Sequence, residues 1–140
     1  DVYNNALLVG NAFYNASYFG NARAFYYNNI INEYGNSISN QHSKMLYGME
    51  NVQKYYNIAK KAAADKEQKA KMAYMLAKTQ RNDFYYNKYF STNTYWGYPD
   101  GAVIQKWQGF VDLKTNYSDT KYYQDVIAEC GYFRKYLGLQ

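Results

Sequence analysis

The fold of this chain is decided by residues 45–90, MLYGMENVQKYYNIAKKAAADKEQKAKMAYMLAKTQRNDFYYNKYF. In the first half of this stretch, apolar and small residues recur at alternating spacings of four and three: Met45, Met49, Val52, Tyr56, Ala59 and Ala63. This spacing predicts one buried face of a helix. Asp65 interrupts the pattern. With Glu67 it favours the start of a second helix, because carboxylates are stabilised near a helix N-terminus.

The second helix is predicted to run to about Phe90 and carries Ala70, Ala73, Tyr74, Ala77 and Phe84. Two long helices that are joined by a tight polar turn must lie antiparallel, so we expect a hairpin over about 44–90. Small residues occur in both helices, at 59, 62 and 63 and at 70, 73 and 77. We expect these two sets of alanines to face each other and to let the two backbones approach closely.

A first hairpin is predicted over about 4–33. Its first helix, 4–19, has a stripe of small and apolar residues at helical spacing: Leu7, Val9, Gly10, Phe13, Tyr14, Ser17 and Tyr18. Gly20-Asn21 provides a stop, because both residue types tolerate the left-handed conformation that ends helices. A second helix is expected over 22–33, and residues 34–41 are typical of a loop.

The C-terminal third begins with an aromatic loop, 91–117, built around the turn sequence Tyr98-Pro99-Asp100-Gly101. A short helix is expected near 102–112 within it. A closing helix is predicted over 119–137, with Ser118 or Asp119 as its N-cap and Gly138 as its stop. The inner face of this helix is expected to contain Tyr123, Val126, Ile127, Cys130, Phe133 and Leu137.

These elements predict one all-α domain of about 5–6 helices, in which antiparallel helix pairs stack as a short right-handed superhelix or an irregular bundle. The 140 residues include a single proline, so little interrupts the helices. No apolar run reaches the roughly 18 residues that a membrane span needs. Because the sequence opens with Asp1 and enters helical periodicity almost at once, we expect it to be part of a longer chain.

The net charge of +5 is concentrated in one stretch. Residues 60–88 carry eight Lys and Arg against three Asp and Glu. A basic face of this kind can meet nucleic acid or anionic lipid. The lysines alternate around the predicted helices instead of forming a stripe, so we interpret them as solvated flanks and do not expect a nucleic-acid partner.

Side chains for catalysis are few. The single His42 lies in a polar loop and is expected to be exposed, and the single Cys130 is expected to be a small buried residue within the closing helix. No phosphate-binding loop or zinc spacing is present. Asp100 and Asp112 are the carboxylates to inspect as a glycosidase-like pair, although we interpret them as solubilising residues. The sequence therefore predicts no enzyme activity, no cofactor and no metal.

Binding is better supported by the composition, which includes 20 tyrosines and 16 asparagines. Twenty tyrosines cannot all be buried in so small a domain, and tyrosine is favoured at interfaces. The candidate partner-binding residues surround the predicted turn: Tyr95, Trp96, Tyr98, Asp100 and Trp107. Two alternatives stay open. The module binds another protein or other domains of its own chain, or it binds carbohydrate on the aromatic loop around Trp96.

The spacing also resembles the tetratricopeptide repeat. Ala70, Tyr74 and Ala77 match the small-aromatic-small spacing of its second helix, and Gly10, Tyr14 and Ser17 repeat it. Residues of the preceding helix resemble the first-helix face, namely Tyr55, Ile58, Ala59 and Ala62. The sequence departs from the pattern at Ala62, where an aromatic is usual, and at Asn82, where a proline is expected. The resemblance implies stacked hairpins with a concave binding face.

Three stretches resemble the C-terminal regions of large uncharacterised proteins from gut Bacteroidetes: FYNASYFGNAR (13–23), DKEQKAKMAYMLAKTQRNDFYY (65–86) and YYQDVIAECGYFRKYL (122–137). This resemblance implies an exported parent protein, in the periplasm or at the cell surface, that could carry a lipid anchor. It implies no activity.

Overall fold

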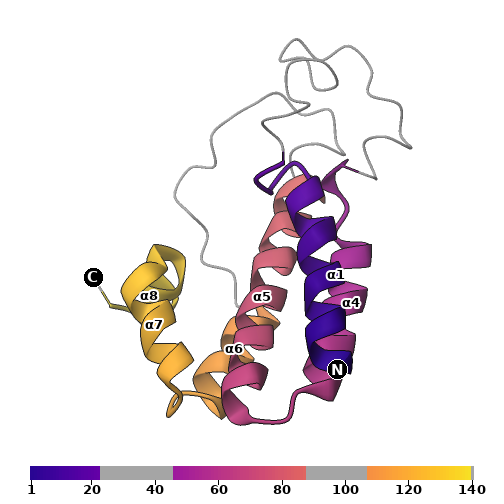
Figure 1. Ribbon diagram of the computed structural model, residues 1–140. Helices are drawn as coiled ribbons and strands as arrows, with labels where there is room; N and C mark the ends of the chain where they lie inside the picture. The colour runs from indigo at the N-terminus through magenta and orange to yellow at the C-terminus, as the bar shows by residue number, and fades with distance from the viewer. Residues whose placement is uncertain (23–45, 88–106, 140) are drawn as a thin grey trace, which may run out of the picture.

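The computed structural model describes residues 1–22, 46–87 and 107–139. Within these ranges the chain forms six helices and no strand (Figure 1). The helices are α1 (Val2–Ala16), α4 (Glu50–Ala62), α5 (Lys66–Tyr85), α6 (Gln108–Asn116), α7 (Lys121–Glu129) and α8 (Gly131–Leu137). The predicted all-α class is confirmed. The predicted helix at 22–33 and the loop at 34–41 lie outside the described residues.

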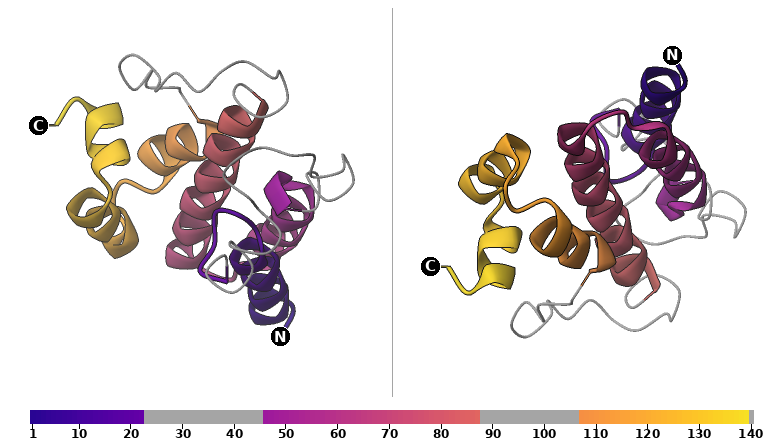
Figure 2. Two further views of the ribbon diagram at one scale, coloured as in Figure 1. Left: turned by 90° about the horizontal axis from the view of Figure 1, so that it is seen from above. Right: turned by 90° about the horizontal axis from the view of Figure 1, so that it is seen from below.

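Helix α5 lies in the middle of the described structure. The α1 and α4 helices lie on one side of it, and α6 followed by α7 and α8 lies on the other (Figures 1 and 2). Contacts join α1 to α4, α4 to α5, and α5 to both α6 and α7. The chain therefore builds two cores that share one helix. None of the helices in the described ranges is both long enough and apolar enough to cross a membrane.

The predicted hairpin of α4 and α5 is confirmed. Every described member of the predicted α4 stripe is buried, and Met45 lies outside the described residues. Asp65 is the N-cap of α5 and accepts a hydrogen bond from the backbone N–H of Gln68 at 2.8 Å. The Gln68 side chain accepts in return from the backbone N–H of Ala64 at 2.8 Å. This reciprocal capping satisfies two donors that the end of a helix would otherwise leave open.

The expectation that the alanines of α4 and α5 face each other is wrong. Ala59 and Ala63 pack with Tyr3 and Ala6 of α1. The alanines of α5 instead pack with residues of the C-terminal helices: Phe110, Leu113, Val126 and Phe133. The alanines of α4 thus pack against α1, whereas the alanines of α5 pack against the C-terminal helices and allow α6 to approach α5 closely.

Gly109 explains why α5 needs that row of alanines. A Cβ added to Gly109 would collide with the backbone oxygen of Ala73 and would lie 2.6 Å from the backbone nitrogen of Ala77. The backbones of α5 and α6 therefore touch at this crossing, which only small residues permit. The backbone N–H of Gly109 also donates to the side-chain oxygen of Gln80 at 3.0 Å.

The opposite face of α5 is buried as well, which the sequence analysis did not predict. Met72 joins the core beneath α1 and α4, and Leu76 packs with the buried stripe of α4. Thr79 and Asn82 are also fully buried. Thr79 donates its hydroxyl to the Leu76 carbonyl at 2.7 Å, so its polar atom is satisfied within the helix. Burial on both faces makes α5 the central helix.

The predicted single closing helix is wrong, because the chain breaks at Cys130 into α7 and α8. Cys130 has an extended backbone (φ −107°, ψ 100°) and is half-buried, so it is not a buried residue within a helix. Glycine follows directly at 131, where it weakens helix continuation. Arg134 then donates to the carbonyls of Ile127 at 3.0 Å and Ala128 at 2.8 Å. These bonds supply donors to carbonyl oxygens at the C-terminal end of α7.

The inner face predicted for 119–137 survives this break. Val126 and Phe133 are buried, and the other four predicted residues pack against the same core. Gly138 ends α8 with φ 77°, as predicted. The short helix predicted near 102–112 corresponds to α6, which lies further along the sequence at Gln108–Asn116. Residues 102–106 lie outside the described part of the chain.

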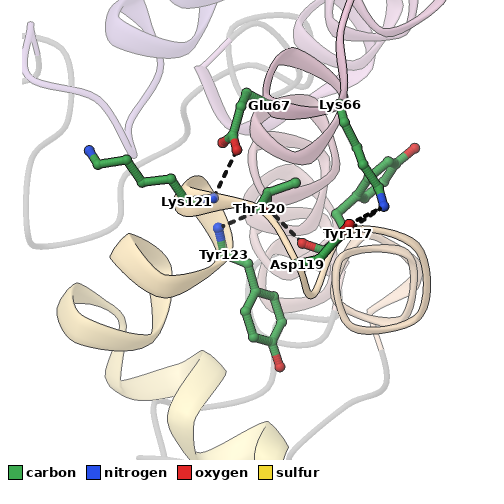
Figure 3. A network of polar contacts seen from close by, with 7 residues as sticks. All are labelled: Lys66, Glu67, Tyr117, Asp119, Thr120, Lys121 and Tyr123. Carbon is green, nitrogen blue, oxygen red and sulfur yellow. Dashed lines mark hydrogen bonds and ion pairs between the residues drawn. The ribbon is translucent and has the colours of Figure 1, made fainter.

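The start of α7 is held by α5 (Figure 3). Thr120, and not Ser118 or Asp119, is the N-cap and accepts from the backbone N–H of Tyr123 at 3.1 Å. The Glu67 carboxylate accepts from the next two backbone N–H groups, of Lys121 at 2.8 Å and Tyr122 at 2.9 Å. A carboxylate at a helix N-terminus is favoured by the helix dipole, so Glu67 docks α7 onto α5.

Candidate interaction surface

The aromatic loop predicted as the binding site lies mostly outside the described residues. Tyr95, Trp96, Tyr98 and Asp100 fall in the range that is not described. Trp107 directly precedes α6. Its ring packs edge-on against Phe84, with ring centroids 5.3 Å apart, and it is half-buried against the core of α5 to α8. The described contacts of Trp107 are therefore packing contacts.

Asp112, the described member of the predicted carboxylate pair, forms an ion pair. Its carboxylate lies 2.7 Å from Lys60 Nζ and accepts from the Gln108 amide at 2.9 Å. Burial alone would raise the pKa of Asp112. The hydrogen bonds from Lys60 and Gln108 and the charge of Lys60 outweigh burial and lower the pKa below its usual value. The group is thus held ionised, which is the wrong state for a general acid.

Metal ligands do not gather in the described ranges: no three His, Cys, Asp or Glu side chains come together there as a metal site requires. His42 lies outside these ranges.

Several cations of the 60–88 stretch have partners within the fold. Lys60 pairs with Asp112, and Lys66 pairs with Asp119 at 2.7 Å. Lys78 Nζ lies 4.7 Å from the centre of the Tyr14 ring, and the Arg81 guanidinium lies 5.0 Å from that of Tyr132. These cations connect neighbouring helices, so part of the basic charge is used inside the structure.

The α1 and α4 helices pack antiparallel at close range. Tyr3 and Ala6 near the start of α1 pack with the end of α4, whereas the Tyr18 N–H, just after α1, donates to the Leu46 carbonyl ahead of α4 at 2.8 Å. Midway, a Cβ added to Gly10 would lie 2.6 Å from two ring carbons of Tyr56. Glycine at this position therefore lets the Tyr56 ring lie against the backbone of α1.

Tyr56 is fully buried at this contact, and its hydroxyl donates to the side-chain oxygen of Asn11 at 2.8 Å. Burial raises the pKa of the Tyr56 phenol above its usual value, so the phenol stays protonated and can donate. The asparagine therefore satisfies a polar atom that burial would otherwise leave without a partner.

Large apolar side chains are exposed mainly on these two helices. In the described ranges seven large hydrophobic residues are exposed, and five of them belong to α1 or α4: Val2, Leu8, Val9, Phe13 and Ile58. Val2, Val9 and Phe13 are separated by seven and four residues, so they fall on one side of α1. Phe13 is 42% exposed although it is a large aromatic residue.

The row on α1 continues onto α4. The rings of Phe13 and Tyr55 stack with centroids 5.7 Å apart and an interplanar angle of 14°. Ile58 is three residues from Tyr55 and lies on the same side of α4. We define these five residues as the α1–α4 face: Val2, Val9, Phe13, Tyr55 and Ile58. Four of these side chains are exposed and Tyr55 is half-buried, and the stacking of Phe13 on Tyr55 connects the residues of α1 with those of α4.

The sequence analysis placed Val9 and Phe13 in one stripe with Gly10 and Ser17, but the structure buries Gly10 and Ser17 and leaves Val9 and Phe13 exposed. The residues that α1 buries completely or nearly so are Tyr3, Ala6 and Gly10. The stripe is wider than the buried face, because α1 packs against α4 on one side only, through Tyr3, Ala6 and Gly10. The sequence did carry a signal for this surface. Val2, Val9 and Phe13 make the apolar side of the helix wider than the side that carries Tyr3, Ala6 and Gly10.

Comparisons with known proteins give no relative: no family model, no characterised protein and no solved structure matches this chain.

Proposed function

We propose that this chain is a non-catalytic interaction module that binds a protein through the α1–α4 face. The partner is another protein or another domain of the same, longer chain. The observation that carries the proposal is the gathering of exposed apolar side chains on α1 and α4. Contiguous apolar surface that is exposed on a folded domain is a frequent mark of a binding site.

The charge of α1 supports the same proposal. No charged residue occurs in Val2–Ala16, and the polar residues there are mostly asparagine. The centres of protein interfaces are depleted of charged residues and enriched in aromatic ones. Phe13 stacked on Tyr55 supplies an aromatic anchor of limited flexibility, which binds at a low cost in conformational entropy.

The non-catalytic part of the proposal is supported by the small inventory of reactive side chains and by Asp112. The chain has one histidine and one cysteine, and Lys60 holds Asp112 in the ionised state. The pairing of α4 with α5, and the packing of α6 on α5, are compatible with a tetratricopeptide-like stack, which we retain as part of the proposal. Export to the periplasm or cell surface is proposed on sequence resemblance alone.

The proposal is tested by placing charges on the α1–α4 face of the full-length protein. Val9→Lys combined with Phe13→Lys should reduce the amount of co-purifying partner by on the order of tenfold or more, since loss of about 1.4 kcal/mol lowers affinity tenfold. The measurement is affinity isolation from cells that make the protein, with quantitative mass spectrometry of the retained polypeptides.

Leu8→Lys is the matched control. Leu8 is 69% exposed and adjoins Val9 in sequence, but it lies about 100° further round the helix, away from Tyr55. This variant should retain the partner. Both variants should remain folded by far-ultraviolet circular dichroism, although loss of the Phe13–Tyr55 stacking should make the double variant unfold at a lower urea concentration. Equal losses in the two variants, or no loss in either, would argue against the α1–α4 face.

A further inference from the structure

A polar pocket lies between α4, α5 and α6, on the side of α4 opposite to Tyr55 and Ile58. Its volume is about 180 Å³. Its polar lining comes from three helices: Gln53, Asn57 and Lys60 of α4, Gln80 of α5, and Gln108 and Asp112 of α6. On α4 these positions are four and three residues apart, which places them on one face of that helix. The pocket is therefore separate from the α1–α4 face.

Three carboxamides of this pocket, those of Gln53, Gln80 and Gln108, are each held by the fold through one atom. Gln80 uses its oxygen to accept from the Gly109 N–H at 3.0 Å. Gln108 uses its nitrogen to donate to Asp112 at 2.9 Å, and Gln53 uses its nitrogen to donate to Asp83. The other amide atom of each side chain has no partner among the described residues. A ligand could therefore accept from the Gln80 amide nitrogen and donate to the amide oxygens of Gln53 and Gln108.

The charges in the pocket cancel. Lys60 Nζ and the Asp112 carboxylate are 2.7 Å apart, and their side chains are 29% and 23% exposed. A charged ligand would have to break this pair, or leave one of its members without a partner. A neutral ligand can instead accept from the remaining hydrogens of Lys60 and donate to the remaining lone pairs of Asp112.

The lining thus offers separate donors and acceptors around a small neutral space. A hydroxyl group donates and accepts at once, so a molecule with several hydroxyls matches such a lining better than a purely donating or accepting one. A volume of about 180 Å³ leaves room for one ring of the size of a sugar.

We propose that this pocket binds a single neutral, hydroxyl-rich ring. The source of the ring is either a free monosaccharide or the terminal unit of an oligosaccharide. Asn57 is exposed and has no hydrogen-bond partner among the described residues, so it is the group with both amide atoms available to the ligand. The sugar site and the proposed protein-binding surface use opposite sides of α4. Failure of one proposal therefore does not affect the other.

Nuclear magnetic resonance of the ¹⁵N-labelled chain tests the proposal, since each Asn and Gln side-chain amide gives its own signals. The probes are glucose, galactose, mannose and N-acetylglucosamine, and an oligosaccharide of each. At least one probe should shift the side-chain amides of Gln53, Asn57, Gln80 and Gln108 with saturation, at a dissociation constant on the order of 1 mM. If only the oligosaccharides bind, the ligand is a glycan terminus, and if the monosaccharides bind equally, it is a free sugar.

Asn57→Ala should weaken this binding about tenfold, which corresponds to loss of about one good hydrogen bond. It should not affect folding, because Asn57 is exposed. Asn5→Ala on α1 is the matched control and should bind like the wild type. The proposal is overturned if no probe gives saturable shifts, if the shifts occur on α1 instead, or if Asn57→Ala binds as well as the wild type.

Discussion

Gly109→Ala is expected to lower the free energy of unfolding by about 3 kcal/mol, at the upper end of the usual cost of overpacking. The added methyl group would meet the backbone of α5 at Ala73 and Ala77, and backbone atoms cannot move aside as a flexible side chain can. Helix α6 would have to move away from α5, and the core that they share with α7 and α8 would open. Urea unfolding followed by far-ultraviolet circular dichroism measures the loss.

Gly131→Ala is the matched control for this substitution. A Cβ at Gly131 would have one neighbour, the Arg134 guanidinium at 3.8 Å, and the position is the first residue of α8. Alanine should therefore stabilise the protein slightly, by about 0.5 kcal/mol, because glycine is a poor helix former. If Gly109→Ala were as stable as Gly131→Ala, the backbones of α5 and α6 would not be in contact.

Phe133→Ala is expected to cost about 3–5 kcal/mol, the range for removal of a fully buried phenylalanine. Phe133 is completely buried, and its ring centre lies 5.0 Å from that of Phe110, 5.4 Å from that of Tyr123 and 5.9 Å from that of Tyr136. Helix α8 has only seven residues and cannot hold its structure alone. Loss of this ring should therefore release α8 as well as open a cavity.

Tyr132→Ala provides the comparison. Tyr132 is 38% exposed, and its described contacts are with the Arg81 guanidinium and the Tyr85 hydroxyl. Its removal should cost less than about 1 kcal/mol, because exposed cation–π contacts are weak. Near-ultraviolet circular dichroism and urea unfolding distinguish the two variants. Similar losses from both would mean that Phe133 is not the centre of this core.

The local pattern predicted single helices well where each helix buries one face. The 4-3-4-3 spacing in α4 identified its buried residues, and Asp65 identified the start of α5. Both signals act over short distances, through helical periodicity and capping. The same reasoning predicted only one face of α5, because a helix that is buried on two sides shows no clear contrast between an apolar and a polar side.

Pairing between helices was predicted less well. The alanines of α4 and α5 could face each other or face other helices, and periodicity alone does not choose between these arrangements. The arrangement depends on Gly109 and Gly10, which lie far from these alanines in the sequence. Gly109 allows α6 to approach α5 closely, and Gly10 allows α1 to approach α4 closely. The break at Cys130 was also missed, although Gly131 was a local sign of it.

The interaction surface was missed for a related reason. The sequence analysis grouped apolar residues at helical spacing into one stripe, but the exposure of each residue depends on how wide the contact with the neighbouring helix is. Val9 and Phe13 are partly exposed, and Phe13 lies at the edge of the contact with α4, where it stacks on Tyr55. The predicted aromatic loop stays a prediction except at Trp107, whose described contacts are with the core.

The central claim is that the α1–α4 face contacts a partner, and site-specific photo-crosslinking tests it most directly. A photoreactive phenylalanine analogue is placed at Phe13 or at Tyr132 of the full-length protein in the cells that make it. These two aromatic residues are similarly exposed, but they belong to α1 and α8, and these two helices lie on opposite sides of α5 (Figure 2). We predict crosslinks from position 13 to another protein or to a distant segment of the same chain, and few from position 132. Absence of crosslinks at position 13, or equal yields at both positions, would contradict the claim.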